Sequence, residues 1–173
     1  MNDVRPAHSR TAPQLDETDR AILALLATDG RMPNSAVAEA VGIAPSTCLN
    51  LIRQLRDQGV IRGFQADIDP AALGRQLQAM VFVRLQPSAR SRMGKFGSYL
   101  AGLPGVIDVY ALAGANDFQV HVAVRDSEAL RAFVYDNLSA VPDVAGTETN
   151  LVFQHITPRP GVGGAGGKSP DIR

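Results

Sequence analysis

The apolar residues of this chain change their spacing once, close to the turn signal Asp69-Pro70. Before this point they recur at helical intervals, and after it strand-like apolar runs alternate with helical patterns. The change predicts two units, a helical one followed by a mixed one, and 173 residues are enough for two small domains. The polar residues 1–14 are expected to form a mobile arm, and the Gly- and Pro-rich residues 158–173 a disordered tail.

The helical unit begins with a clear start signal. Asp16 is a suitable N-cap, and Asp19 follows three residues later in a capping-box position. A second helix is expected over about 33–41, where Gly42 ends it.

A third helix is expected from Pro45 to about Gln58, with a buried face formed by Leu49, Ile52 and Leu55. Two helices joined by a short Gly-containing turn, behind a support helix, predict a helix-turn-helix domain over 15–62. Residues 63–77 are expected to form a linking strand and a connector.

The mixed unit, residues 78–157, has the order strand, helix, strand, strand, helix, strand. The expected strands cover 78–85, 106–113, 118–124 and 147–155, and the expected helices cover 88–103 and the segment after the cap Asp126 or Ser127. This order predicts a ferredoxin-like βαββαβ domain, so the fold class of the whole chain is α+β. The first strand is apolar on both faces, which predicts cover on both sides.

Composition excludes several functional classes. No apolar run is long enough for a membrane span, and one cysteine excludes an intrachain disulfide, which favours a cytoplasmic location. One cysteine and three histidines do not provide a zinc cluster, and no spacing supports a nucleophilic triad, so we expect neither metal, cofactor nor enzyme activity. Cys48 is interpreted as a small half-buried hydrophobe, with a redox switch as the alternative.

The third expected helix has a polar exposed side. Hydroxyl, amide and guanidinium groups suit contacts to phosphates and base edges of double-stranded DNA, particularly near a helix N-terminus. The alternative is a solvated polar face, and the helix-turn-helix frame favours DNA contact. The candidate DNA-binding residues are Ser46, Thr47, Asn50, Arg53, Gln54 and Arg56.

Several segments together resemble the Lrp/AsnC ("feast/famine") transcription regulators. They are LDETDRAILALLATDGR from Leu15, the Ser46-Thr47-Cys48-Leu49 segment, and LAGANDF from Leu112. The resemblance covers about residues 15–157 in order. It implies a DNA-binding domain, a linking strand and an effector-binding domain, assembly into homodimers and often octamers, and modulation by a small molecule, commonly an amino acid.

The LAGANDF segment is the candidate effector site. Backbone N–H groups around Gly114 suit a carboxylate and Asp117 suits an ammonium group, whereas the alternative is a hairpin in which Asp117 bonds its own backbone. The resemblance favours the effector site. The candidate residues are Leu112, Gly114, Asn116, Asp117, Thr149 and Leu151.

Two other functional classes remain open from the sequence. One is a ferredoxin-like metabolite-binding or enzyme domain whose helix-turn-helix serves assembly. The other is an assembly module that does not bind DNA.

Overall fold

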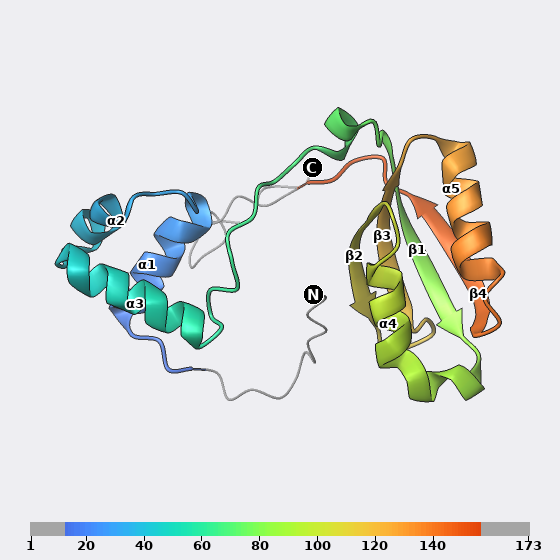
Figure 1. The fold of residues 1–173 in the computed structure, drawn as a ribbon, viewed down its shortest axis with the longest axis horizontal. Coiled ribbons are helices and arrows are strands. Elements are labelled where there is room, and N and C mark those ends of the chain that lie inside the picture. Colours follow the sequence, from blue (N-terminus) through green and yellow to red (C-terminus); the bar gives the residue numbers. More distant parts are fainter. Residues whose placement is uncertain (1–12, 157–173) are drawn as a thin grey trace, which may run out of the picture. The chain divides into compact units, whose positions relative to one another are not determined.

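The structure is a computed structural model that describes residues 13–156. These residues form two compact units that divide between Asp67 and Ile68 (Figure 1). The expected tail lies outside the described residues, and so does the expected arm apart from Pro13 and Gln14.

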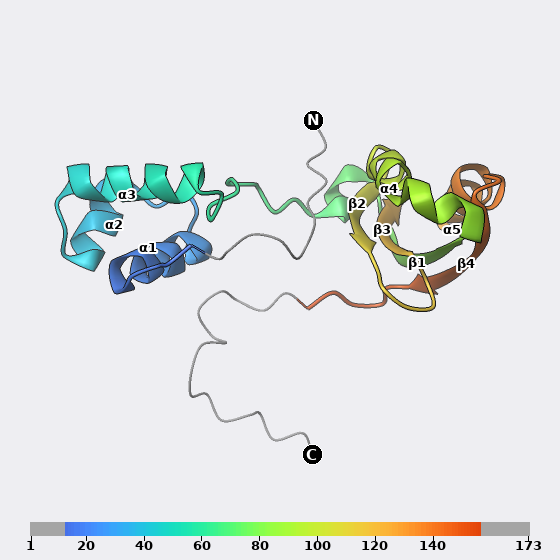
Figure 2. The same ribbon diagram turned by 90° about the horizontal axis from the view of Figure 1, so that it is seen from below.

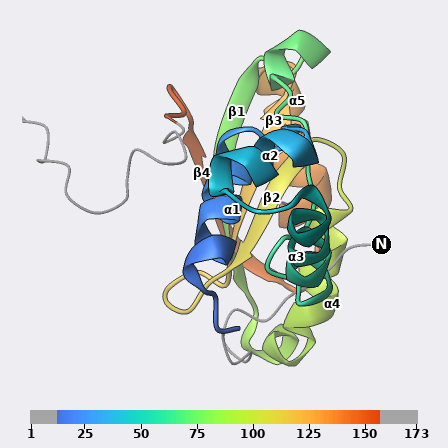
Figure 3. The same ribbon diagram turned by 90° about the vertical axis from the view of Figure 1, so that its left-hand side faces the viewer.

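The first unit consists of three helices, α1 (Glu17–Thr28), α2 (Asn34–Val41) and α3 (Pro45–Asp57) (Figure 3). The capping box at the start of α1 is confirmed, because Asp16 Oδ1 accepts the backbone N–H of Asp19 at 2.7 Å and Asp19 Oδ2 accepts that of Asp16 at 3.2 Å. Gly42 ends α2 in the left-handed conformation, with φ of 77°, which a residue with a side chain rarely adopts.

The helices of the first unit pack around a small core. Its fully buried members are Ile22, Val37, Ala38, Cys48 and Leu55. The expected inward position of Leu49 is wrong, because 40% of this residue is exposed. Each residue advances about 100° around a helix, so a buried face centred on Cys48 and Leu55 includes Leu51 and Ile52 and turns Leu49 to the side.

The connector between the units is not the strand that was expected. Residues 62–69 have no regular secondary structure, and a short 3₁₀ turn, Pro70–Leu73, follows with Asp69 as its cap. A strand requires a neighbour for its N–H and C=O groups, and the described part of the subunit offers none to this segment.

The second unit is a four-stranded antiparallel sheet covered by two helices, which confirms the ferredoxin-like fold class. Its strands are β1 (Leu77–Leu85), β2 (Val106–Ala111), β3 (Phe118–Val124) and β4 (Val144–Leu151), in the order β2-β3-β1-β4. The helices α4 (Met93–Ala101) and α5 (Ser127–Val134) lie on the same side of the sheet (Figure 2).

The core of the second unit lies between these helices and the sheet. The odd-numbered residues of β1 from Ala79 to Leu85 are buried there, together with Phe118, Val120 and Val122 of β3. Phe96 and Leu100 of α4 and Leu130 and Phe133 of α5 complete it. On the opposite face of the sheet, Met80 and Phe82 are only half-buried.

Two boundaries in the second unit differ from the sequence expectation. The helix expected from residue 88 begins as a 3₁₀ turn, Pro87–Arg92, before α4, and α5 continues in a π-helical turn, Tyr135–Ser139. The last strand is shifted toward the N-terminus, since β4 pairs with β1 from Leu151 back to Val144. The segment after Leu151 therefore leaves the sheet earlier than expected.

Candidate functional sites in the helix-turn-helix and the β2–β3 loop

The turn between α2 and α3 has helix-turn-helix geometry. The two helices are bent by 103° relative to each other, within the range of about 90–120° typical of this motif. The side-chain amide of Asn34, at the start of α2, donates to the carbonyl oxygen of Pro45, at the start of α3, at 2.9 Å. This contact links the beginnings of the two helices and helps to set their angle.

The six candidate DNA-binding residues lie on α3 and are all exposed. Ser46 and Thr47 occupy its first turn, and the N-cap residue Ala44 provides no side-chain hydrogen bond. The first backbone N–H groups of α3 are thus without a side-chain cap, which suits contact with a phosphate. Arg53 and Arg56 follow on the exposed side.

Cys48 lies in the core of the first unit, fully buried. Burial raises the pKa of its thiol above the usual value, because the thiolate would lose its hydration. Thiol oxidation proceeds through the thiolate, so this environment supports the interpretation of Cys48 as a packing residue.

The β2–β3 loop, residues 112–117, holds four of the candidate effector residues. Gly114 is exposed with φ of 148°, and a Cβ built on it would meet nothing within 4 Å. Leu112 and Asn116 are half-buried. The loop therefore presents open backbone at Gly114 between two half-buried residues.

Asp117 closes this loop and is buried, with 6% of the residue exposed. Its Oδ2 accepts the backbone N–H of Leu85 at 2.8 Å, and its Oδ1 lies 3.2 Å from Nε of Arg90. Its own backbone N–H donates to Val83, and its carbonyl oxygen accepts from Leu112. The carboxylate is thus engaged with the end of β1 rather than with its own turn, and its role as an ammonium ligand stays a prediction.

The two candidates on β4 lie apart from this loop in one subunit. Thr149 pairs with Val81 and Leu151 with Ala79, so β1 separates both from β3, and they lie nearer the start of β1 than Asp117 does. Thr149 lines an open groove of about 390 Å³ between α5 and β4, together with Leu130, Val134 and Tyr135.

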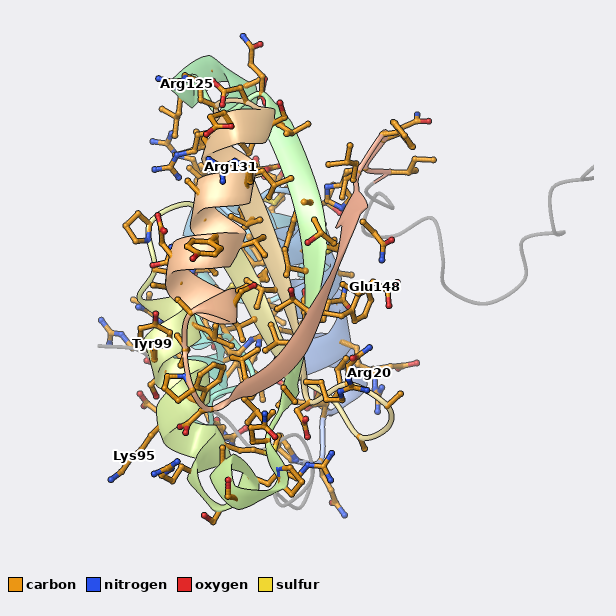
Figure 4. All side chains as sticks on the ribbon, turned by 90° about the vertical axis from the view of Figure 1, so that its right-hand side faces the viewer. Arg20, Lys95, Tyr99, Arg125, Arg131 and Glu148 are labelled. Atoms are coloured by element: carbon orange, nitrogen blue, oxygen red, sulfur yellow. The ribbon has the colours of Figure 1, made fainter. Side chains whose placement is uncertain are left out.

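Figure 4 shows this part of the molecule, with Arg131 on α5 and Glu148 on β4. Arg131 also lines the groove, while its guanidinium is bound by Glu128 on the same helix. The surface of the groove is mainly apolar.

His121 is a buried polar residue of the second unit. Only 7% of the residue is exposed, and its Nε2 lies 2.9 Å from Oε1 of Gln78. Burial lowers the pKa of His121 below 6.5, nearby His155 lowers it further, and Asp108 opposes the shift.

The sequence did not identify Arg90 or the groove beside α5. Arg90 is separated from Asp117 by 27 positions, and no local spacing connects an arginine in a 3₁₀ turn with an aspartate in a distant loop. The groove depends on how far α5 leaves β4 uncovered, and that follows from tertiary packing.

Comparison with known families agrees with both units. Residues 15–62 match a family model described as winged helix-turn-helix DNA-binding, and residues 78–162 match one described as the Lrp/AsnC ligand binding domain. Within the described residues, no single helix is long and apolar enough to cross a membrane; only the bent pair α2 and α3 passes such a test, by length and composition alone.

Curated relatives extend over most of the chain. The HTH-type transcriptional regulator AldR of Mycobacterium tuberculosis is 56% identical over 154 residues, covering 89% of this chain and 83% of the relative. The transcriptional regulator AzlB of Bacillus subtilis is 32% identical over 139 residues, covering 80% of this chain and 88% of the relative.

Solved structures give the same result. The crystal structure of MtbAldR matches with a TM-score of 0.70 and 54% identity, covering 83% of this chain and 98% of that one. A transcriptional regulator of Neisseria meningitidis in complex with L-Met matches with a TM-score of 0.77 and 30% identity, covering 84% and 94%. These relatives are regulators rather than enzymes, and the same holds for this chain. The two domain matches, the sheet order and the relatives together show that the chain belongs to the Lrp/AsnC family of transcriptional regulators.

Proposed function

We propose that this regulator alters its DNA binding when a small amino acid binds to its second unit. The observation that carries the proposal is the β2–β3 loop, whose open backbone at Gly114 lies within the segment matched to a ligand-binding domain. The solved relative from Neisseria meningitidis is a complex with L-Met, which supports an amino acid as the class of effector. A DNA-binding regulator acts where the DNA is, so the proposal includes a cytoplasmic location.

The proposal includes self-association through the sheet. Both helices cover one face, while the opposite face carries the half-buried Met80 and Phe82 and the half-exposed Tyr110. Removing such apolar area from water contributes about 25 cal/mol per Å². A second copy of the same face is the simplest cover for it, which gives a homodimer, and dimers assemble further toward an octamer.

The effector is proposed to bind between subunits. Thr149 and Leu151 lie across β1 from the loop, so a single chain does not bring the loop and these two β4 residues to one ligand. A loop from one subunit placed against β4 of another would unite them. Binding there would favour one assembly over another, and assembly sets the distance between pairs of α3 helices.

On DNA, the α3 helices of a dimer are proposed to enter major grooves one helical turn apart, about 34–36 Å along the duplex. Arg53 and Arg56 contribute phosphate contacts, while Asn50 and Gln54 have the amide groups that can read base edges. Ser46 and Thr47, at the start of α3, complete the contact set.

The test uses the full chain. Thermal shifts are measured with each of the twenty amino acids, and footprinting on the DNA upstream of its own gene is repeated with each amino acid that binds. We expect at least one amino acid to raise the melting temperature and to change the length or spacing of the footprint. Binding of an amino acid with an unchanged footprint would contradict effector control, and the absence of any binding would contradict the amino-acid class.

A further inference from the structure

The contacts of Asp117 do not favour the ammonium-binding role that the sequence suggested for it. Both carboxylate oxygens have partners in the subunit, at 2.8 Å from the N–H of Leu85 and 3.2 Å from Nε of Arg90. The residue is also held through its own backbone by Val83 and Leu112. An ammonium group approaching Asp117 would have to displace one of these contacts, so Asp117 is poorly available as a direct ligand.

Arg90, in contrast to Asp117, is accessible to a ligand. Its side chain is 52% exposed, and its ion pair with Asp117 uses the inner Nε position. A guanidinium offers two donor edges in one plane, and holding Nε leaves the outer edge, Nη1 and Nη2, for another acceptor. Among the described residues, Asp117 is the only carboxylate within ion-pair distance of Arg90.

A neighbouring arginine in the same 3₁₀ turn provides a contrast. Arg92 is similarly exposed, at 55%, but its terminal Nη2 donates to Asp143 at 2.7 Å. The outer edge of Arg92 is therefore in use within the subunit. Of the two arginines, only Arg90 is held through Nε alone. Among the described residues, no carboxylate pairs with its Nη1 or Nη2.

We infer that Arg90 binds the carboxylate of the effector, and that Asp117 acts on the effector only by holding Arg90 in place. This inference rests on the proposed function and names the binding group within that site. A bidentate pair of two parallel N–H···O bonds suits a planar carboxylate, and open backbone at Gly114 leaves room beside Asp117 for the rest of a small ligand. Arg90 is thus the residue that selects ligands carrying a free carboxylate, and Asp117 is a positioning residue.

The experiment compares three ligands on the full chain by calorimetry. They are an amino acid, its carboxamide and its des-amino acid, beginning with L-methionine, L-methioninamide and 4-(methylthio)butanoic acid, and with L-leucine and its analogues as the second series. The other amino acids follow if neither series binds. We expect the carboxamide to bind at least about tenfold more weakly than the amino acid, because it loses a charge-assisted pair.

Variants of the full chain then test which residue causes the preference for the acid over the carboxamide. Arg90→Gln should weaken binding of the amino acid at least about tenfold and should bind acid and amide alike, whereas Arg92→Gln, the matched control, should stay within about twofold of wild type. Arg90→Lys should fall between, since an ammonium supplies charge without the planar fork. Asp117→Asn should reduce the discrimination between acid and amide without abolishing it.

Each outcome decides. An Arg90→Gln protein that melts like wild type and still prefers the acid over the amide would overturn the inference and leave the proposed function intact. If only the des-amino acid binds more weakly and the carboxamide binds like the amino acid, Asp117 would be restored as an ammonium ligand. That result would also overturn the inference about Arg90. If none of the twenty amino acids binds, the proposed function fails and the inference fails with it.

Discussion

The carboxylate of Asp117 accepts the backbone N–H of Leu85 at 2.8 Å and thereby links the start of β3 to the end of β1. Both residues are buried, so removing the acceptor leaves an N–H group without a partner. Asp117→Ala should lower the free energy of unfolding of the second unit by about 1–3 kcal/mol.

Tyrosine fluorescence can follow this loss selectively. The chain has three tyrosines and no tryptophan, and Tyr99, Tyr110 and Tyr135 all lie in the second unit. Urea unfolding of full-length Asp117→Ala and Asp117→Asn, monitored in this way, should show the smaller loss for Asn, whose amide oxygen can still accept from Leu85. Equal stability of Asp117→Ala and wild type would show that this contact is weak.

The exposed arginines of α3 should determine the salt dependence of DNA binding. If Arg53 contacts one phosphate, Arg53→Ala should weaken binding to all sites similarly and reduce the slope of log K against log salt by about one unit. Arg75→Ala, which removes the same charge from the second unit, is the control and should leave the slope unchanged. An Arg53→Ala protein with the wild-type slope and affinity would remove Arg53 from the set of contacts.

Gly105, before β2, should tolerate no side chain. Its φ is 88°, and a Cβ there would lie 2.8 Å from the carbonyl oxygen of Ala123. Gly105→Ala should therefore lower the free energy of unfolding of the second unit by about 1–3 kcal/mol. Gly94, in α4, has open space around it, so Gly94→Ala should instead stabilise by about 0.5–1 kcal/mol. The two variants are compared by thermal melts, and similar melting temperatures would contradict the steric argument.

His121 should make the second unit less stable in mild acid. Because burial holds its pKa in the folded chain below the ordinary 6.5, the unfolded chain binds the proton more readily as the pH falls. Stability from this group is complete above about pH 6.5 and decreases as the pH falls below it, by at most about 1.4 kcal/mol per pH unit for one proton.

The corresponding measurement is urea unfolding between pH 7.5 and 5, followed by tyrosine fluorescence at about six pH values in wild type and His121→Gln. The glutamine variant lacks the titrating group and should show a shallower decline. His155→Gln removes a neighbour that lowers the pKa of His121, so its decline should be slightly shallower than that of wild type and steeper than that of His121→Gln. Parallel curves for wild type and His121→Gln would exclude this contribution.

Local signals in the sequence predicted most of the fold. Asp16 and Asp19 identified the start of α1, Gly42 the end of α2, and the alternation in β3 its full length. The errors arose where packing decides. Leu49 was assigned inward from a three-residue repeat, although its position depends on which face of α3 the rest of the unit covers.

The candidate sites were predictable only in part. The exposed side of α3 follows from helical spacing, so Ser46 to Arg56 could be selected from the sequence. The ion pair between Asp117 and Arg90 joins a loop to a 3₁₀ turn that local patterns assigned to a regular helix. Separation of Thr149 from the loop depends on strand order, because β1 lies between β3 and β4.

That strand order has a genetic consequence. If each effector site combines the loop of one chain with β4 of another, a cell carrying two defective alleles, one altered at Gly114 and the other at Thr149, can regain function. In a mixed pair, the intact loop of one chain meets the intact strand of the other, and one of the two sites is restored. The alleles should therefore complement each other while each fails alone, which a site built within a single chain does not allow.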